Sequence, residues 1–196
     1  MTGQSFALDE GLLIQRAREG DEAAFAAIYD HYERPIYNYV YKIMVSPDDA
    51  ADITQDCFVK AYVALPKTNE ELNLQAWLYR IASNACLDVL RRRKRVRWMS
   101  WDIFDDGTLP EPSANENDGP ELTYSQQETR EIVIRVLKKM SPKYRTCLVL
   151  REYEGFSCAE IAEIMGSSRS AIKSMLFRGR EQFREVYQSL EANGQL

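Results

Sequence analysis

Polar and basic side chains recur at helical spacing near the C-terminal end of the sequence. Residues 158–178 read CAEIAEIMGSSRSAIKSMLFR, in which the small residue Ala162 is followed four residues later by Gly166. This spacing is typical of a helix-turn-helix, whose second helix can enter the major groove of DNA. An ordinary helical hairpin is the alternative interpretation. The outward side of the second helix could contact bases and phosphates through Arg169, Ser170, Lys173, Ser174, Phe177 and Arg178.

A second polar stripe lies in residues 76–95, AWLYRIASNACLDVLRRRKR. Arg80, Asn84, Asp88 and Arg91 recur every three or four residues, which places them on one side of a helix. The stripe then runs into the continuous basic block 91–95. Basic side chains along a helix can follow phosphates, and an exposed Asn can hydrogen-bond a base. As a charge run alone, the block fits a solvated helix end equally well.

Catalytic or metal-binding chemistry finds little support in the composition. His31 is the only histidine, and no C-x-x-C pair occurs among Cys57, Cys86, Cys147 and Cys158. We therefore expect no metal, no cofactor, no small-molecule substrate and no enzymatic activity. A DNA-cutting enzyme that uses Ser83 or Tyr79 as its nucleophile is the alternative, although neither has a nearby histidine.

The composition is that of a soluble globular protein, with 45% hydrophobic and 28% charged residues in 196. No apolar run reaches the roughly 18 residues that a membrane span needs. The N-terminal stretch MTGQSFALDE lacks the basic region and apolar core of a signal peptide. We therefore expect a cytoplasmic protein with no membrane insertion and with reduced cysteines.

Apolar residues at three- and four-residue spacing predict an all-α fold, with no strand pattern. Helix starts are predicted at Asp21, at Ser46 before Pro47, and at Ser157, where Glu160 completes the spacing of a capping box. Pro35 predicts that the helix starting at Asp21 is kinked or split. Helices are predicted over 8–20, 21–44, 48–65, 74–95, 125–140 and 142–155, and through the helix-turn-helix to the end of the chain.

The helix predicted over 48–65 has two different sides. One side carries Asp52, Gln55 and Asp56, together with further acids, and is either solvated or a docking surface for a basic helix of a partner protein. The other side is expected to be buried through Ala51, Ile53, Phe58, Ala61 and Tyr62.

Residues 99–124 interrupt the helical periodicity with prolines, glycines and acids. The surrounding segment 96–125 holds one basic and seven acidic residues, although the whole chain has a net charge of only −5. Such a composition predicts a solvated, flexible linker. The fold expected is therefore two small helical domains, 1–97 and 126–196, joined by an acidic flexible linker over 98–125, with the helix-turn-helix in the second domain.

Four stretches in this order resemble ECF (extracytoplasmic function) sigma factors, the promoter-recognition subunits of bacterial RNA polymerase. The resemblance extends from Leu12 to Tyr187 through AREGDEAAFAAIYDHY, DDAADITQDCFVKAYVAL, AWLYRIASNACLDVLRRRKR and the segment from MSPKY to FRE. It implies that 1–97 is sigma region 2, which binds core RNA polymerase and opens the minus-ten element. It also implies that 126–196 is sigma region 4, which reads the minus-thirty-five element as duplex DNA.

The resemblance also implies roles for individual residues. Asp52, Gln55 and Asp56 match the residues that dock on the polymerase clamp. Asn84 matches the residue that receives a base flipped out of the non-template strand, a step that costs a few kcal/mol of unstacking. The remaining minus-ten contacts would be Arg80, Asp88, Arg91, Arg92 and Arg93. The minus-thirty-five contacts would be Arg169, Ser170, Lys173, Ser174, Phe177 and Arg178.

The implied partners are core RNA polymerase, through its clamp and flap, promoter DNA, and an anti-sigma factor of the kind that often holds family members inactive. Met175 and Gly179 depart from the family's pattern, so its minus-thirty-five sequence does not carry over to this chain. Two alternatives remain open from the residues alone. One is a stand-alone dimeric helix-turn-helix regulator, and the other is a helical module that binds only proteins.

Overall fold

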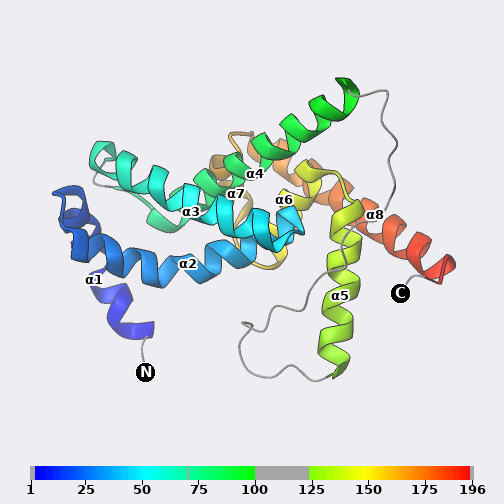
Figure 1. Ribbon diagram of the computed structural model, residues 1–196, viewed down its shortest axis with the longest axis horizontal. Helices are drawn as coiled ribbons and strands as arrows, with labels where there is room; N and C mark the ends of the chain where they lie inside the picture. The colour runs from blue at the N-terminus through cyan, green and yellow to red at the C-terminus, as the bar shows by residue number, and fades with distance from the viewer. Residues whose placement is uncertain (1–2, 70, 100–123, 195–196) are drawn as a thin grey trace.

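The computed structural model describes residues 3–69, 71–99 and 124–194 (Figure 1). These residues form α-helices and one short 3-10 helix without any strand, which confirms the predicted all-α class. Most of the predicted linker, residues 100–123, lies outside the described residues. The elements are α1 Gly3–Arg18, α2 Glu22–Met44, α3 Pro47–Ala64, η1 Leu65–Lys67, α4 Leu74–Met99, α5 Tyr124–Lys139, α6 Pro142–Glu152, α7 Cys158–Ile164 and α8 Arg169–Ala192.

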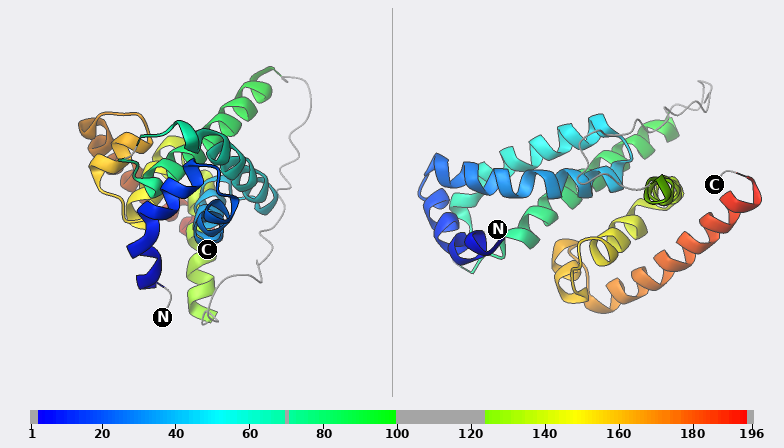
Figure 2. Two further views of the ribbon diagram at one scale, coloured as in Figure 1. Left: turned by 90° about the vertical axis from the view of Figure 1, so that its left-hand side faces the viewer. Right: turned by 90° about the horizontal axis from the view of Figure 1, so that it is seen from below.

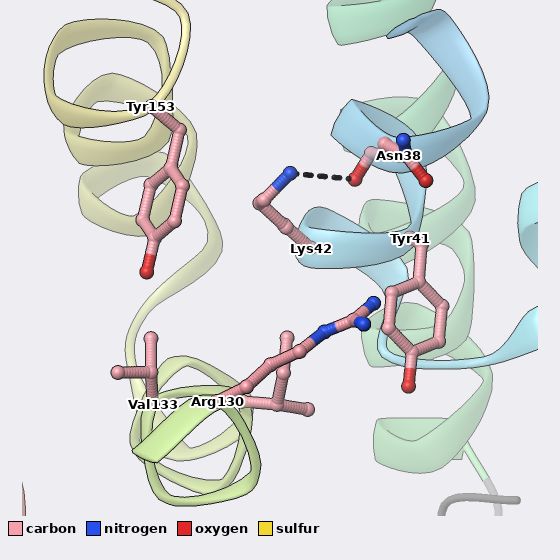
Figure 3. Close-up of a pocket in the computed structure, with 7 residues that line it drawn as sticks. Asn38, Tyr41, Lys42, Arg130, Val133 and Tyr153 are labelled. Atoms are coloured by element: carbon pink, nitrogen blue, oxygen red, sulfur yellow. Dashed lines mark hydrogen bonds between the residues drawn. The ribbon is translucent and has the colours of Figure 1, made fainter. Parts of the chain in front are cut away.

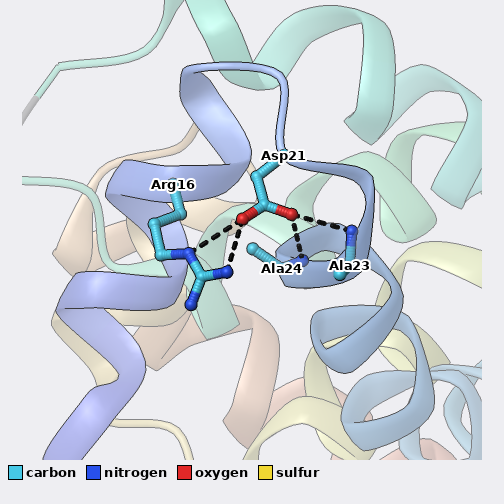
Figure 4. Close-up of polar contacts among 4 residues, drawn as sticks. All are labelled: Arg16, Asp21, Ala23 and Ala24. Carbon is cyan, nitrogen blue, oxygen red and sulfur yellow. Dashed lines mark hydrogen bonds and ion pairs between the residues drawn. The ribbon is translucent and has the colours of Figure 1, made fainter.

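Asp21 fixes the turn between α1 and α2 (Figure 4). Its Oδ1 accepts hydrogen bonds from the backbone N–H groups of Ala23 and Ala24 at 2.9 and 3.1 Å. Its Oδ2 accepts one from Arg16 Nε at 2.8 Å. The hydrogen bond from the Ala24 N–H group stabilises the charged carboxylate most, and the bond from Arg16 adds to it. Both lower the pKa of Asp21. The predicted N-cap at this position is confirmed.

Pro35 was expected to kink or split α2; the split is wrong, and a kink stays a prediction. The helix is continuous from Glu22 to Met44 with Pro35 inside it. Proline removes one backbone hydrogen bond and destabilises a helix interior by about 3 kcal/mol. Pro35 is exposed, whereas Ile36, Tyr39 and Val40 directly after it are fully buried. Burial of these side chains offsets the local loss and keeps the helix in one piece.

The N-terminal half, α1–α4, is built around α2, which packs against α1, α3 and α4. The Tyr39 hydroxyl and Ser83 Oγ share a buried hydrogen bond of 2.7 Å between α2 and α4. In α3 the buried side is shifted from the prediction. Ala50 is fully buried and Ala51 exposed, and Tyr62 remains 46% exposed. Tyr62 instead makes an edge contact with Phe25 of α2 near the surface.

The C-terminal half, α5–α8, depends on a close approach between α6 and α8 at Gly179. A Cβ atom added there would lie 3.5 Å from the backbone oxygen of Tyr144 and 3.9 Å from Leu148 Cδ1. These are ordinary contact distances, so a methyl group fits and a larger side chain does not.

Gly179→Ala is therefore expected to stabilise the protein, because alanine favours the helix interior by about 1 kcal/mol over glycine. For a chain of this length the melting temperature should rise by about 2–4 °C in thermal unfolding followed by circular dichroism. Gly179→Leu is the matched control and should lower the melting temperature. A lower melting temperature for the alanine variant would show that α6 and α8 are packed too closely for a methyl group.

The two halves lie directly against each other (Figure 2). α4 packs on α6 and α7, and α2 packs on α5 and α6. We refer to this contact of α2 and α4 with α5, α6 and α7 as the seam. Its existence was not predicted, since a flexible linker leaves the relative position of two domains undetermined.

Among the described residues, no helix combines the length and apolarity that membrane crossing requires. Nor do these residues contain a group of three side chains suited to bind a metal ion. Cys57, Cys86 and Cys147 are free and buried, and burial raises the pKa of each thiol to about 12. These thiols therefore stay protonated at neutral pH and are poor nucleophiles.

Candidate nucleic-acid interface

The turn between α7 and α8 has the geometry predicted for a helix-turn-helix. At its start, Ser157 Oγ accepts from Glu160 N and Glu160 Oε2 accepts from Ser157 N, at 3.3 and 2.8 Å, which confirms the capping box. At the turn, Gly166 has a φ of +58°, a left-handed conformation that glycine adopts readily. Ser168 then caps α8 by accepting from Ala171 N at 3.2 Å.

Buried side chains fix the angle between α7 and α8. Ile161 and Ile172 are fully buried, and Met175 is 8% exposed. Ile161 of α7 and Ile172 and Met175 of α8 thus form the core between the two helices. The same packing turns the remaining side of α8 outward, toward solvent.

The outward side of α8 carries all six residues predicted to contact the minus-thirty-five element, and all six are exposed: Arg169, Ser170, Lys173, Ser174, Phe177 and Arg178. Phe177 has 63% of its surface exposed, which is unusual for a phenylalanine. An exposed apolar ring beside basic side chains suits contact with a thymine methyl group. Arg180 lies outside this set because it pairs with Glu152 of α6 at 2.7 Å.

α4 carries the predicted minus-ten residues, but they do not all share one side of the helix. Arg80 and Asn84 are exposed, and Asp88 binds the neighbouring Arg91 at 2.8 Å. Arg92 is also exposed. Arg93 points instead to α3, where its guanidinium binds both carboxylate oxygens of Asp49. This guanidinium holds the pKa of Asp49 below its usual value. A DNA contact by Arg93 stays a prediction.

Asp52, Gln55 and Asp56 are exposed together on α3. The exposed surface continues along the helix through three large apolar residues, Val59, Tyr62 and Val63, which are 46–63% exposed. This extension was not predicted, because the three- and four-residue spacing of the helix places Tyr62 on its apolar side. Apolar residues beside acids are typical of a protein-docking surface rather than of a solvated helix side.

The seam brings the two candidate DNA-reading surfaces next to each other. Arg80 of α4 and Arg169 of α8 line the same open pocket, together with Glu163 and Ser167. A second cavity of about 230 Å³ lies where α2 meets α5 and the end of α6 (Figure 3). Its lining includes Lys42, Arg130 and Tyr153.

Family models match both halves of the chain. The Sigma-70 region 2 model matches residues 28–96, and the Sigma-70 region 4 model matches residues 130–183. The "ECF RNA polymerase sigma factor SigW" of Bacillus subtilis is 31% identical over 179 residues, which cover 90% of this chain and 96% of the relative. The "ECF RNA polymerase sigma-E factor" of Escherichia coli K12 is 31% identical over 180 residues, which cover 89% of this chain and 92% of the relative.

Two solved structures share the fold. CnrH, solved in complex with the cytosolic domain of CnrY, has a TM-score of 0.66 at 22% identity and matches 91% of this chain and 97% of its own. The sigma factor RpoE, solved in complex with the anti-sigma factor NepR from Bartonella quintana, has a TM-score of 0.65 at 24% identity. That match covers 84% of this chain and 96% of the RpoE chain.

Proposed function

This chain belongs to the ECF family of RNA polymerase sigma factors, and we propose how its residues divide the work of promoter recognition. Residues 1–97 act as region 2, 98–125 as an acidic linker and 126–196 as region 4. The matches at residues 28–96 and 130–183 support these boundaries. The chain acts in the cytoplasm, where core RNA polymerase and promoter DNA are found. The family assignment leaves the stand-alone regulator, the DNA-cutting enzyme and the interaction module without support.

The observation that carries the proposal for region 4 is the exposed outward side of α8. Basic and polar side chains there follow a well-packed helix-turn-helix, and the nearby Phe177 ring is exposed. In such motifs the second helix enters the major groove and its N-terminal residues contact base edges. We assign Lys173, Ser174, Phe177 and Arg178 to the minus-thirty-five bases. Arg169 and Ser170, at the start of α8, are assigned to phosphates, which the helix dipole also favours.

Region 2 is assigned two surfaces. Asp52, Gln55 and Asp56 on α3 dock the polymerase clamp. On α4, Asn84 holds the flipped minus-ten base while Arg80 and the arginines at 91–93 follow the backbone nearby. Asp88 is assigned to hold Arg91, which it binds at 2.8 Å.

The net charge of −5 agrees with this division of roles. A sigma factor need not bind DNA tightly alone, because the core enzyme supplies most of the affinity. The proposal also includes control by an anti-sigma factor. The RpoE chain, which has the same fold, was solved with such a partner.

Run-off transcription with bacterial core RNA polymerase on a pool of randomised promoters tests the proposal. Specific initiation that depends on this protein, with two selected sequence elements, is the expected result. Absence of both initiation and core binding would overturn it.

In this assay Lys173→Ala is expected to lower the preference for the selected upstream element by about tenfold, since one base or phosphate contact is worth about 1–3 kcal/mol. Preference at the downstream element should be unchanged. Lys143→Ala, which removes an exposed positive charge from α6, is the matched control. Equal losses in both variants would indicate a general charge effect instead of a contact made by α8.

A further inference from the structure

One short loop of the C-terminal half, residues 153–157 between α6 and α7, adds specific polar contacts to the helix packing across the seam. Glu154 in this loop accepts a hydrogen bond from the Tyr79 hydroxyl of α4 at 2.6 Å. Its other carboxylate oxygen lies 3.9 Å from Lys42 Nζ of α2, and its side chain is only 14% exposed. A single carboxylate of the C-terminal half therefore binds two helices of the N-terminal half.

Two aromatic rings of the same loop, Tyr153 and Phe156, also contact the N-terminal half. Tyr79 is 2% exposed, and its ring lies between Tyr39 at 4.9 Å and Phe156 of the loop at 5.0 Å. Lys42 Nζ also lies 5.1 Å from the centre of the Tyr153 ring, and Figure 3 shows these two side chains at the cavity beside the loop. Burial raises the pKa of Tyr79, and the nearby Glu154 carboxylate raises it further. The hydroxyl therefore stays protonated and remains a hydrogen-bond donor. The loop thus holds the seam by charge, hydrogen bond and ring packing.

A buried cation lies beside the seam. Arg145 of α6 is 4% exposed, and its Nη1 donates to Leu137 O at 3.0 Å. Within the described part of the chain, its Nε has no hydrogen-bond partner. Burial lowers the pKa of this guanidinium to about 10. The nearby Cys86 of α4 has a smaller effect that raises the same pKa. A buried cation with an unpartnered N–H group is unfavourable, and this unfavourable term lies beside the seam.

The closed arrangement does not fit a promoter. The centres of the minus-ten and minus-thirty-five elements are about 25 base pairs apart, which is about 85 Å of B-DNA. In the closed protein, Arg80 of one reading surface and Arg169 of the other line a single pocket. The two halves must therefore separate before both elements can be read at once.

We propose that Glu154 is an internal latch: bound to Tyr79 and Lys42, it holds the free protein closed until core polymerase binding separates the two halves. The effect of the latch on transcription rests on the proposed function. The closed arrangement that Glu154 holds is a property of the free protein and does not depend on that function. Removing the latch increases the fraction of open molecules, and apparent affinity for a partner rises with the fraction that is competent to bind.

Single-molecule energy transfer between dyes at positions 60 and 188 tests the latch in the full-length protein without polymerase. Both positions are exposed, one on α3 and one on α8, and the dyes are attached through unnatural amino acids. Glu154→Gln keeps a neutral acceptor but removes the charge that Tyr79 and Lys42 bind. Tyr79→Phe removes the donor. Each change is expected to raise the ratio of open to closed molecules by about tenfold, equivalent to about 1.4 kcal/mol.

The matched control is Glu152→Gln, the same change two residues away. Glu152 pairs with Arg180 inside the C-terminal half, so its loss leaves the seam intact. The double variant Tyr79→Phe/Glu154→Gln should open less than the two single effects combined, because both act on one interaction. An unchanged ratio in Glu154→Gln, or an equal rise in Glu152→Gln, would overturn the latch.

Titration of core polymerase separates a failed latch from a failed function. If both inferences hold, Glu154→Gln binds core polymerase about tenfold more tightly than the unmodified protein. If the energy-transfer ratio rises and no variant binds the core enzyme, the latch stands and the proposed function falls. If the unmodified protein binds and initiates while the ratio never changes, the function stands and the latch falls.

Discussion

Reversing the charge of two acids on α3, Asp52→Lys with Asp56→Lys, is expected to weaken binding to core RNA polymerase by about 1000-fold. Removing one partner of a buried interfacial charge pair costs 2–5 kcal/mol or more, and reversal adds repulsion against a basic partner. Both side chains are exposed, so the helical fold should tolerate the change. Fluorescence anisotropy with labelled protein and core enzyme measures the effect, and far-ultraviolet circular dichroism verifies the fold.

Asp30→Lys is a suitable control for this experiment. It reverses one exposed acid of the same half, on α2 instead of α3. A small loss of affinity is expected there, from long-range charge alone. Affinity that stays unchanged in the α3 double variant would place the clamp-docking surface elsewhere. Loss of affinity in Val59→Ser and Val63→Ser would then place the docking surface on the apolar residues further along α3.

Asn84→Ala should remove the preference for one base of the minus-ten element, with a loss of about 10- to 100-fold in initiation at the preferred promoter. The side-chain amide can hydrogen-bond a flipped base on its edge, and such contacts discriminate by about 1–3 kcal/mol. Sequencing of run-off products from a library randomised over the minus-ten element would show the loss at a single position. The upstream element should be selected as before.

Gln75→Ala is the control for the Asn84 experiment because it removes an exposed amide from a different side of α4, near its start. Its promoter preference should match that of the unmodified protein. A uniform fall in initiation across all minus-ten sequences in Asn84→Ala would mean that this residue contacts the backbone or supports melting. In that case the base-reading role would pass to another exposed residue of α4.

Local signals in the sequence located most helix ends because the hydrogen bonds that start a helix connect residues two or three positions apart. The caps at Asp21, Ser46 and Ser157 are where the sequence placed them. Gly166 forms the turn before α8 for an equally local reason. Pro35 does not split α2 because its local effect competes with the burial of neighbouring side chains, which depends on tertiary packing.

Side-chain partners were harder to predict than helix ends. Arg93 belongs to a run of five basic residues, and nothing in that run distinguishes it from Arg92. Only the crossing of α3 and α4 brings Arg93 to Asp49, forty-four positions earlier. Tyr62 was assigned to the core from its spacing, but the angle between α2 and α3 leaves it at the surface with Phe25.

The sequence by itself determined the all-α class, the helix-turn-helix, the exposed side of α8 and the family. These follow from periodicity, caps and ordered motifs, which are properties of neighbouring residues. The tertiary structure alone decided that the two halves close on each other and that Glu154 meets Tyr79 across the seam. Those two residues are seventy-five positions apart. A contact across such a separation depends on how whole helices pack, and no local pattern in the chain specifies it.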